Sequence, residues 1–391
     1  MSPADATSAS TPALLLRGAT PVGESAAVDL LLSGGRLAGR DATGTRAGAR
    51  TIDLDGLLVA PGFIEVQVNG ATGHDLTRDP ESIWDVGTAL APFGVTAFLP
   101  TIVTSPPDVV EHARRVLADG PPRGYAGAVA IGLHVEGPFL NPIRHGAHDT
   151  SLLRPPSLDA VGSWAPETGV RIVTLAPELP GALDVVRVLV SRGVVVSAGH
   201  SDATAAQAAA GFDAGIRYVT HLFNAMRELG HHEPGLAGAA LADSRVTVGL
   251  IPDGIHVAPA VVDLAWRLAA GRFSIVTDAI AALGVPAGSF VLGGYEIVSD
   301  GLAGRLRDGT LAGSVIGLDR AIRNVAAFTG ASAAQVVEAV TTTPARLLGL
   351  RDRGTLDPGA RADLVVLTPQ LEVVATIVGG AVVHAGDDRW V

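Results

Sequence analysis

Short apolar runs recur through the middle of the chain, and most are separated by alanine-rich stretches with helical spacing. Strands that alternate with helices in this way predict parallel βαβ units. Eight such units over about 250 residues predict a (β/α)8 barrel, with a doubly wound open sheet as the competing α/β fold. The apolar runs lie at residues 62–68, 95–102, 129–135, 170–176, 194–198, 218–220, 246–251 and 273–277, and the helical stretches at 82–93, 107–118, 183–191, 203–214 and 259–270.

The two ends of the chain carry a different pattern, in which short strands alternate with glycine-rich turns. Residues 12–60 and 351–391 both have this character, and the simplest packing joins them into one small β-sandwich domain beside a catalytic barrel at 61–350. Residues 331–348 predict one late helix that returns the chain to this domain. Residues 1–11 are polar and predict a disordered tail.

Four polar side chains follow directly on apolar runs, namely Glu136, His200, His221 and Asp278. The carboxyl ends of parallel strands meet at one face of a barrel, so we expect these side chains to lie together. Two imidazoles and a carboxylate are a ligand set for a divalent metal that keeps a position open for water, and Asp278 is suited to proton transfer. A single histidine at a strand end is more often structural, but four such groups in one barrel favour a functional site.

The composition of the chain excludes several kinds of catalytic site and partner. With 48% hydrophobic and 17% charged residues, the 391-residue chain has enough apolar side chains to form a sizeable core. The chain has no cysteine, and all 28 basic residues are arginine, which excludes thiolate ligands, Schiff-base lysines and a carboxylated lysine that bridges two metals. A net charge of −11 argues against nucleic acid as a partner. The sequence also lacks a signal peptide and any apolar run of about 18–20 residues, so we expect a cytoplasmic protein with no membrane partner.

Seven motifs together carry a family resemblance over nearly the whole chain. They are Pro-Gly-Phe-Ile-Glu-Val-Gln-Val-Asn-Gly at 61–70, His-Val-Glu-Gly-Pro-Phe at 134–139, Gly-His-Ser-Asp at 199–202, Thr-His-Leu-Phe-Asn-Ala-Met at 220–226, Asp-Gly-Ile-His at 253–256, Thr-Asp-Ala at 277–279 and Leu-Ala-Gly-Ser at 311–314. With them the chain resembles the N-acetylglucosamine-6-phosphate deacetylases of the amidohydrolase superfamily.

The resemblance implies a reaction and the roles of several residues. Glu136, His200 and His221 would bind one divalent metal, with zinc expected and iron, manganese or cobalt as alternatives. Asp278 would take a proton from the attacking water and return it to the leaving amine, and His256 would polarise the acetamide carbonyl. The products would be acetate and glucosamine 6-phosphate.

A single metal is the better expectation, although some relatives carry a second one. Many amidohydrolases place two histidines on the first strand for a buried second metal, but this chain has Gln67 and Asn69 there. Amides are weak metal ligands, so we expect these two side chains to hydrogen-bond to the groups of the site instead.

Further residues are assigned to substrate binding by the same resemblance, and the family implies a homodimer that binds a small amino sugar phosphate. The substrate-binding positions are Ala147, His148, Asn224, Ala225, Arg227, His232, Asp253, Gly254, Ile255, His256, Leu311, Ala312 and Gly313. The last three would close over the substrate.

One position departs from the family. An arginine that binds the substrate phosphate usually precedes the Pro-Gly after the Asn-Ala-Met segment, whereas this chain has His232 there, followed by Glu233. Histidine is mostly neutral at pH 7 and lacks the two-pronged donor geometry of arginine. Arg227 or a neighbouring subunit could compensate. Otherwise the substrate is N-acetylgalactosamine 6-phosphate, an unphosphorylated N-acetyl hexosamine or an N-acyl amino acid. A non-catalytic sugar-phosphate-binding protein is the rival from another class.

Overall fold

The computed structural model describes residues 12–40 and 48–390, so the predicted tail at 1–11 lies outside the described residues. Within these ranges, eight parallel strands form a barrel and pair in chain order. A bridge between Val68 and Ala279 joins the last strand segment to the first. The fold class predicted from the sequence is confirmed, and the open sheet is excluded. The barrel strands are β6 (Phe63–Val68), β9 (Val95–Val103), β11 (Leu133–Glu136), β12 (Val170–Leu175), β13 (Val195–Ala198), β14 (Tyr218–Val219), β15 (Thr247–Leu250) and β16 (Phe273–Ile275).

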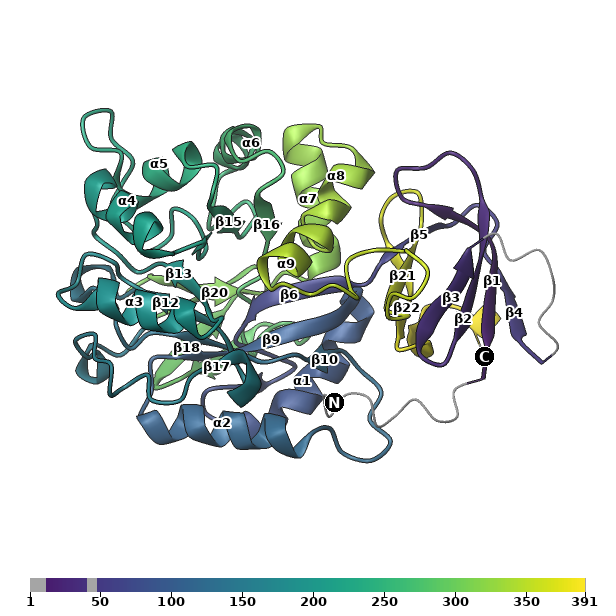
Figure 1. The fold of residues 1–391 in the computed structure, drawn as a ribbon, viewed down its shortest axis with the longest axis horizontal. Helices are drawn as coiled ribbons and strands as arrows, with labels where there is room; N and C mark the ends of the chain where they lie inside the picture. Colours follow the sequence, from purple (N-terminus) through teal and green to yellow (C-terminus); the bar gives the residue numbers. More distant parts are fainter. Residues whose placement is uncertain (1–11, 41–47, 391) are drawn as a thin grey trace.

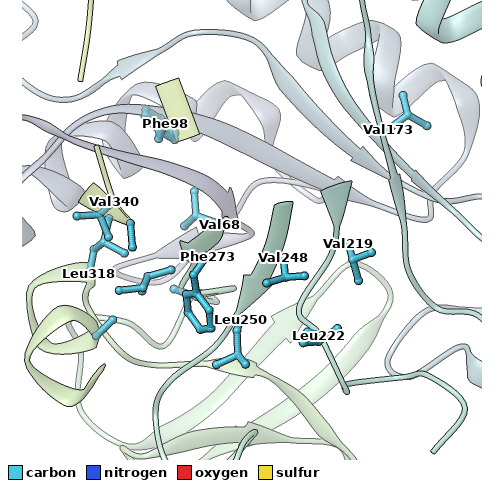
Figure 2. Close-up of a cluster of buried hydrophobic side chains, with 14 of the residues drawn as sticks. Val68, Phe98, Val173, Val219, Leu222, Val248, Leu250, Phe273, Leu318 and Val340 are labelled. Carbon is cyan, nitrogen blue, oxygen red and sulfur yellow. The ribbon is translucent and has the colours of Figure 1, made fainter. Parts of the chain in front are cut away.

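The barrel strands are buried on both faces. In β12, Ile172 belongs to one buried cluster together with Tyr218, whereas the next residue, Val173, belongs to the large cluster shown in part in Figure 2. Val219, which follows Tyr218, also lies in that second cluster. Successive strand residues point to opposite faces, so burial of both faces requires a continuous apolar run. This is why the strands could be recognised in the sequence.

Helices connect most of the successive barrel strands and cover the outside of the barrel (Figure 1). In the described residues, β11 and β12 are joined instead by a long loop with three 3-10 turns. No helix in the described part of the chain is long and apolar enough to cross a membrane. The helices are α1 (Ile83–Leu90), α2 (Pro107–Asp119), α3 (Ala182–Ser191), α4 (Ala205–Ala214), α5 (Gly235–Ala242), α6 (Pro259–Leu268), α7 (Leu318–Thr329), α8 (Ala333–Glu338) and α9 (Thr342–Leu347).

The single helix predicted over residues 331–348 is wrong, because the segment forms the two short helices α8 and α9. Thr341 lies between them with φ of −128° and ψ of −82°, outside the helical region. Pro344 explains the break. In one continuous helix its ring would clash with the carbonyl of Val340, four residues earlier, and its missing N–H would leave that carbonyl unpaired.

A separate, antiparallel sheet follows β16 in the chain and was not predicted from the sequence. It consists of β17 (Gly288–Leu292), β18 (Tyr295–Ser299), β19 (Ala303–Arg305) and β20 (Leu311–Ser314). Leu311, Ala312 and Gly313 belong to β20, and their expected contact with the substrate stays a prediction. Ser314 N–H donates to Asp278 O at 3.0 Å, so this sheet is attached to the rim of the barrel.

Both ends of the chain contribute to one sheet of eight strands in the described residues. Figure 1 shows the N-terminal strands, in purple, beside the C-terminal strands, in yellow, at one side of the barrel. β5 pairs with β21 and joins the two groups. The boundaries at residues 60 and 350 stay predictions. The strands are β1 (Leu14–Pro21), β2 (Val28–Ser33), β3 (Arg36–Arg40), β4 (Arg50–Asp53), β5 (Leu58–Pro61), β21 (Leu364–Leu367), β22 (Val373–Val378) and β23 (Ala381–Ala385).

Asp363 is a buried charge at the start of β21. Its carboxylate forms ion pairs with Arg353 and with Arg361, the latter at 3.1 Å, and accepts a hydrogen bond from Gly379 N–H at 2.7 Å. Its backbone carbonyl accepts from Gly62 N–H, just before the first barrel strand. Asp363 therefore links the small sheet to the start of the barrel.

We expect Asp363→Asn to lower the free energy of unfolding by about 3 kcal/mol, because it leaves the buried Arg353 without its counter-charge. Denaturant unfolding measures the change. The matched control is Glu296→Gln, which breaks an ion pair with Arg307 whose side chains are 46% and 81% exposed. That variant should change the free energy by less than about 1 kcal/mol. Equal effects of the two substitutions would contradict the structural role of Asp363.

Candidate functional site

The candidate site lies where four barrel strands end. Glu136 is the last residue of β11, and His200, His221 and Asp278 follow β13, β14 and β16 by two or three residues. These last three residues have positive φ values of 48°, 31° and 50°. Left-handed backbone is uncommon for residues other than glycine and is concentrated at functional sites. The chain thus turns sharply after each strand, at the residue that carries the functional group.

Glu136, His200 and His221 converge on one another. His200 Nε2 lies 3.4 Å from Glu136 Oε1, His221 Nε2 lies 3.1 Å from the same oxygen, and the two Nε2 atoms are 3.0 Å apart. Ligands of a tetrahedral zinc, each about 2.05 Å from the ion, lie about 3.3 Å from one another. The three side chains are buried. Their spacing and chemistry therefore fit one divalent metal.

The orientation of His200 also suits metal binding. Its Nδ1–H donates to the Arg144 carbonyl at 3.0 Å, which leaves the lone pair of Nε2 directed at Glu136 and His221. A hydrogen bond on the far nitrogen of a metal-binding histidine commonly fixes the tautomer and the ring orientation in this way. His221 Nδ1 has no hydrogen-bond partner among the described residues.

His148 lies in the same cluster, with its ring centroid 4.4 Å from that of His200. Its Nδ1 accepts from Thr104 N–H at 3.2 Å, so the proton of the neutral ring sits on Nε2. That Nε2–H lies 3.9 Å from Glu136 Oε2. Burial, followed by the charge of His200, lowers the pKa of His148 well below its ordinary value and keeps the ring neutral. His148 is therefore a hydrogen-bond donor into the site, which agrees with its expected contact with substrate.

Asp278 is held by the two amides on the first strand. Its Oδ1 accepts from Asn69 Nδ2 at 2.7 Å and from Gln67 Nε2 at 3.2 Å, and Gln67 Nε2 also lies 3.3 Å from Glu136 Oε1. Both amides thus hydrogen-bond to groups of the site, and a single metal stays a prediction. Burial, and then the charge of Glu136, raises the pKa of Asp278 to about 6, near the range in which a general base operates.

His256 is oriented by Asp253. His256 Nδ1 lies 2.6 Å from Asp253 Oδ2, and Asp253 Oδ1 accepts from the backbone N–H groups of Ile255 and His256, both at 2.8 Å. Burial alone would raise the pKa of Asp253, but the hydrogen bond and charge of His256 lower it overall. His256 Nε2 has no partner among the described residues, so it can donate to a substrate oxygen.

The remaining predicted substrate residues lie on the segments around these groups. Asn224 Nδ2 donates to the His221 carbonyl at 3.2 Å, and Ala225 has a positive φ of 50°. Gly146 lies against both His200 and Ala225, which places the adjacent Ala147 beside the site. Gly254 has φ of 80°, and Ile255 is exposed. Arg227 forms an ion pair with Asp202, whereas His232 is exposed on the loop that follows.

Two buried residues near the site were not identified from the sequence. Glu65 accepts from Gln67 N–H at 2.9 Å and from Thr277 N–H at 3.0 Å, so it ties the first strand to the segment of Asp278. Burial raises the pKa of Glu65 to about 8. His134 lies 3.1 Å from the Val66 carbonyl and 2.7 Å from Thr174 Oγ1. The sequence signal for these two residues was the presence of a carboxylate and an imidazole inside apolar runs, Glu65 in 62–68 and His134 in 129–135.

Comparison with known proteins identifies the protein family. The profile of the Amidohydrolase family matches residues 58–383, which is most of the chain. This chain belongs to the amidohydrolase family. The class agrees with a barrel in which the buried side chains of Glu136, His148 and His200 form a group that could hold a metal.

Within this family, the chain is most usefully compared with individual deacetylases. The chain is 41% identical to human N-acetylglucosamine-6-phosphate deacetylase, over 86% of this chain and 85% of the relative. It is 39% identical to N-acetylgalactosamine-6-phosphate deacetylase of Escherichia coli O157:H7, over 82% and 86%. A solved Mycobacterium smegmatis N-acetyl-D-glucosamine-6-phosphate deacetylase variant, in complex with N-acetyl-D-glucosamine-6-phosphate, superposes with a TM-score of 0.87, 35% identity and coverage of 95% and 100%. The resemblance inferred from the motifs is confirmed.

We expect His221→Ala to lose the bound metal and His148→Ala to retain it, because only the first removes a lone pair that faces Glu136. Metal content per chain after dialysis, by elemental analysis, measures the difference, and wild-type protein should hold about one ion per chain. His112, which pairs with Glu81 on the outer surface, provides the His→Ala control. Loss of metal from His148→Ala together with retention in His221→Ala would show that the ligand set is different.

Proposed function

We propose that this protein hydrolyses the acetamide of N-acetylglucosamine 6-phosphate to glucosamine 6-phosphate and acetate. The observation that carries the proposal is the cluster of Glu136, His200 and His221 with Asp278 hydrogen-bonded beside it. These side chains are metal ligands and a proton acceptor, which are the groups needed for amide hydrolysis by an activated water. The names of the similar proteins, and the sugar phosphate bound to the Mycobacterium smegmatis variant, support the choice of substrate.

Glu136, His200 and His221 would hold one divalent ion, which we propose is zinc, because the three donors are two nitrogens and one oxygen at tetrahedral spacing. Such an ion supplies Lewis-acid activation of water and of the carbonyl when it is bound. The remaining steps are carried by the side chains of the chain itself.

Asp278 is the proposed proton carrier. Its carboxylate takes a proton from the attacking water and then delivers it to the amine nitrogen, which leaves once the C–N bond breaks. Asn69 and Gln67 keep Oδ1 in place during this exchange. His256, fixed by Asp253, donates from Nε2 to the acetamide oxygen as negative charge develops there. His148 donates from Nε2 to a sugar oxygen.

N-acetylgalactosamine 6-phosphate is the second candidate substrate, since the relative from Escherichia coli O157:H7 bears that name at nearly the same identity. The two sugars differ only in the configuration of one hydroxyl group. A homodimer and a cytoplasmic location stay predictions that accompany this proposal.

Acetate release from the two N-acetyl hexosamine 6-phosphates and from free N-acetylglucosamine tests the proposal. We expect the highest kcat/KM for N-acetylglucosamine 6-phosphate. Asp278→Asn should lower kcat by about 10³-fold, because it removes the proton carrier, while metal content stays unchanged. Release from none of the sugars by metal-loaded protein would refute the proposed function. Unchanged turnover in the Asp278 variant would refute the mechanism.

The pH dependence of kcat/KM should report Asp278. Since the carboxylate must be ionised to accept a proton, activity should fall as the pH drops below about 6, the raised pKa of Asp278. Asn69→Ala removes the 2.7 Å hydrogen bond that favours the ionised form, so the acidic limb should move to higher pH. Gln335→Ala, at the start of α8 away from the site, should leave the limb in place. An acidic limb that moves to lower pH in Asn69→Ala would contradict this assignment.

A further inference from the structure

Four buried polar side chains inside the barrel form one continuous set of hydrogen bonds, which we call the His134 network. Ser197 Oγ lies 2.6 Å from Thr220 Oγ1, which lies 2.7 Å from Thr174 Oγ1. Thr174 Oγ1 lies 2.7 Å from His134 Nε2, and His134 Nδ1 lies 3.1 Å from the Val66 carbonyl. All four residues have an exposed fraction of 0%. The network therefore runs from β13 and the residue after β14, through β12 and β11, to β6.

Only one arrangement of protons satisfies every link of the network. The Val66 carbonyl can only accept, so His134 Nδ1 carries a proton and donates it. Burial lowers the pKa of His134 to about 4, so the ring is neutral at pH 7 and its Nε2 is an acceptor. Thr174 must then donate to that Nε2, Thr220 to Thr174, and Ser197 to Thr220. Each hydroxyl has one proton and each proton is used, so the loss of one hydroxyl breaks the network.

Packing alone does not require these hydroxyl groups. The interior of a parallel barrel is usually filled by branched apolar side chains, and valine has the shape of threonine. A buried hydroxyl group, in contrast, costs free energy unless it finds a partner. A buried network in which every donor is used makes the surrounding structure rigid and favours a single arrangement. The His134 network therefore has the character of a device that fixes positions.

Members of the network lie a few residues before the proposed metal ligands. His134 precedes Glu136 by two residues on β11, so the two side chains lie on the same face of that strand. Thr220 directly precedes His221. The network is thus the layer of side chains beneath the candidate metal centre.

Thr174 and Thr220 also support the backbone of the other ligand segments. The Thr174 carbonyl accepts from Gly137 N–H at 3.1 Å, in the turn that follows the ligand on β11. A Cβ atom on Gly199 would lie 2.8 Å from Thr174 Cγ2 and 3.1 Å from Thr220 Cβ. The backbone directly before His200 therefore rests on the side chains of these two threonines.

We propose that the His134 network positions Glu136, His200 and His221, so that the affinity for the metal depends on buried side chains that are not themselves ligands. The inference rests on the proposed function, in which these three groups hold a divalent ion. The ligands come from three different strands, and binding requires their donor atoms to stay close together. The network links these strands one layer below the donor atoms, where the sheet alone would leave side-chain positions to packing.

The test is the Kd for Zn²⁺, measured by competition with a chelator. Thr220→Val keeps the shape of the side chain but removes two links of the network, and its Kd should rise about tenfold. Thr220→Ser keeps the hydroxyl group and should stay within about threefold of wild type. Ser197→Ala removes only the terminal link and should raise the Kd about threefold, which gives a second, milder variant.

Thr376→Val is the matched control for the loss of a buried hydroxyl group. Thr376 is also fully buried, but it lies on β22 in the small sheet and donates to the Ala91 carbonyl at 2.7 Å. This variant should be destabilised about as much as Thr220→Val in denaturant unfolding, yet its Kd for Zn²⁺ should stay within about twofold of wild type. The comparison separates a positioning role from a general loss of stability.

A wild-type Kd in both Thr220→Val and Ser197→Ala would overturn the inference, and so would an equal loss of affinity in Thr376→Val. Failure of Thr220→Ser to restore binding would show that the hydroxyl group is not the cause. Failure of metal-loaded wild type to release acetate from any of the sugars would refute the proposed reaction. The zinc affinities decide the positioning role whether or not acetate is released.

Discussion

Two carboxylates that face the same buried space dominate the chemistry of this protein. Glu136 and Asp278 share the amide of Gln67, which lies 3.3 Å from one and 3.2 Å from the other. Desolvation and mutual repulsion disfavour two negative charges at such a separation, which is why the pKa of Asp278 rises to about 6. A divalent cation held beside Glu136 would relieve this repulsion.

The barrel closes at this same place. Asp278 N–H donates to the Gln67 carbonyl at 3.0 Å, and Asn69 N–H donates to the Ala279 carbonyl at 2.7 Å, so the first and last strand segments are joined on both sides of the base. Ser314 then attaches β20 to the Asp278 carbonyl. Asp278 is consequently held through its backbone by two sheets and through its side chain by two amides. This fixed orientation suits the role of general base proposed for Asp278.

The parts of this structure that were predictable share a physical cause. A strand buried on both faces must be apolar throughout, so a polar residue at its end stands out, as with Glu136 and His200. The strands β17 and β18 are partly exposed, and glycines stand in the short turns of this sheet, such as Gly293, Gly294 and Gly301, so the sequence of the segment resembles that of a loop. The proton position on His148 depends on Thr104, 44 residues away, and only the folded chain brings the two together. The roles of the individual site residues are proposals.

In the proposed mechanism, catalysis and substrate selection are carried by different parts of this fold. The proposed metal ligands and Asp278 lie at or just after strand ends, where paired backbone fixes their positions. The groups proposed to select the substrate lie on loops such as 224–235, which can change residues without moving the strands. A substitution on such a loop can therefore alter substrate binding while Asp278 and Glu136 keep their geometry. In the same way, Arg227 is bound to Asp202 rather than free, so an arginine in the loop does not by itself provide an anion site.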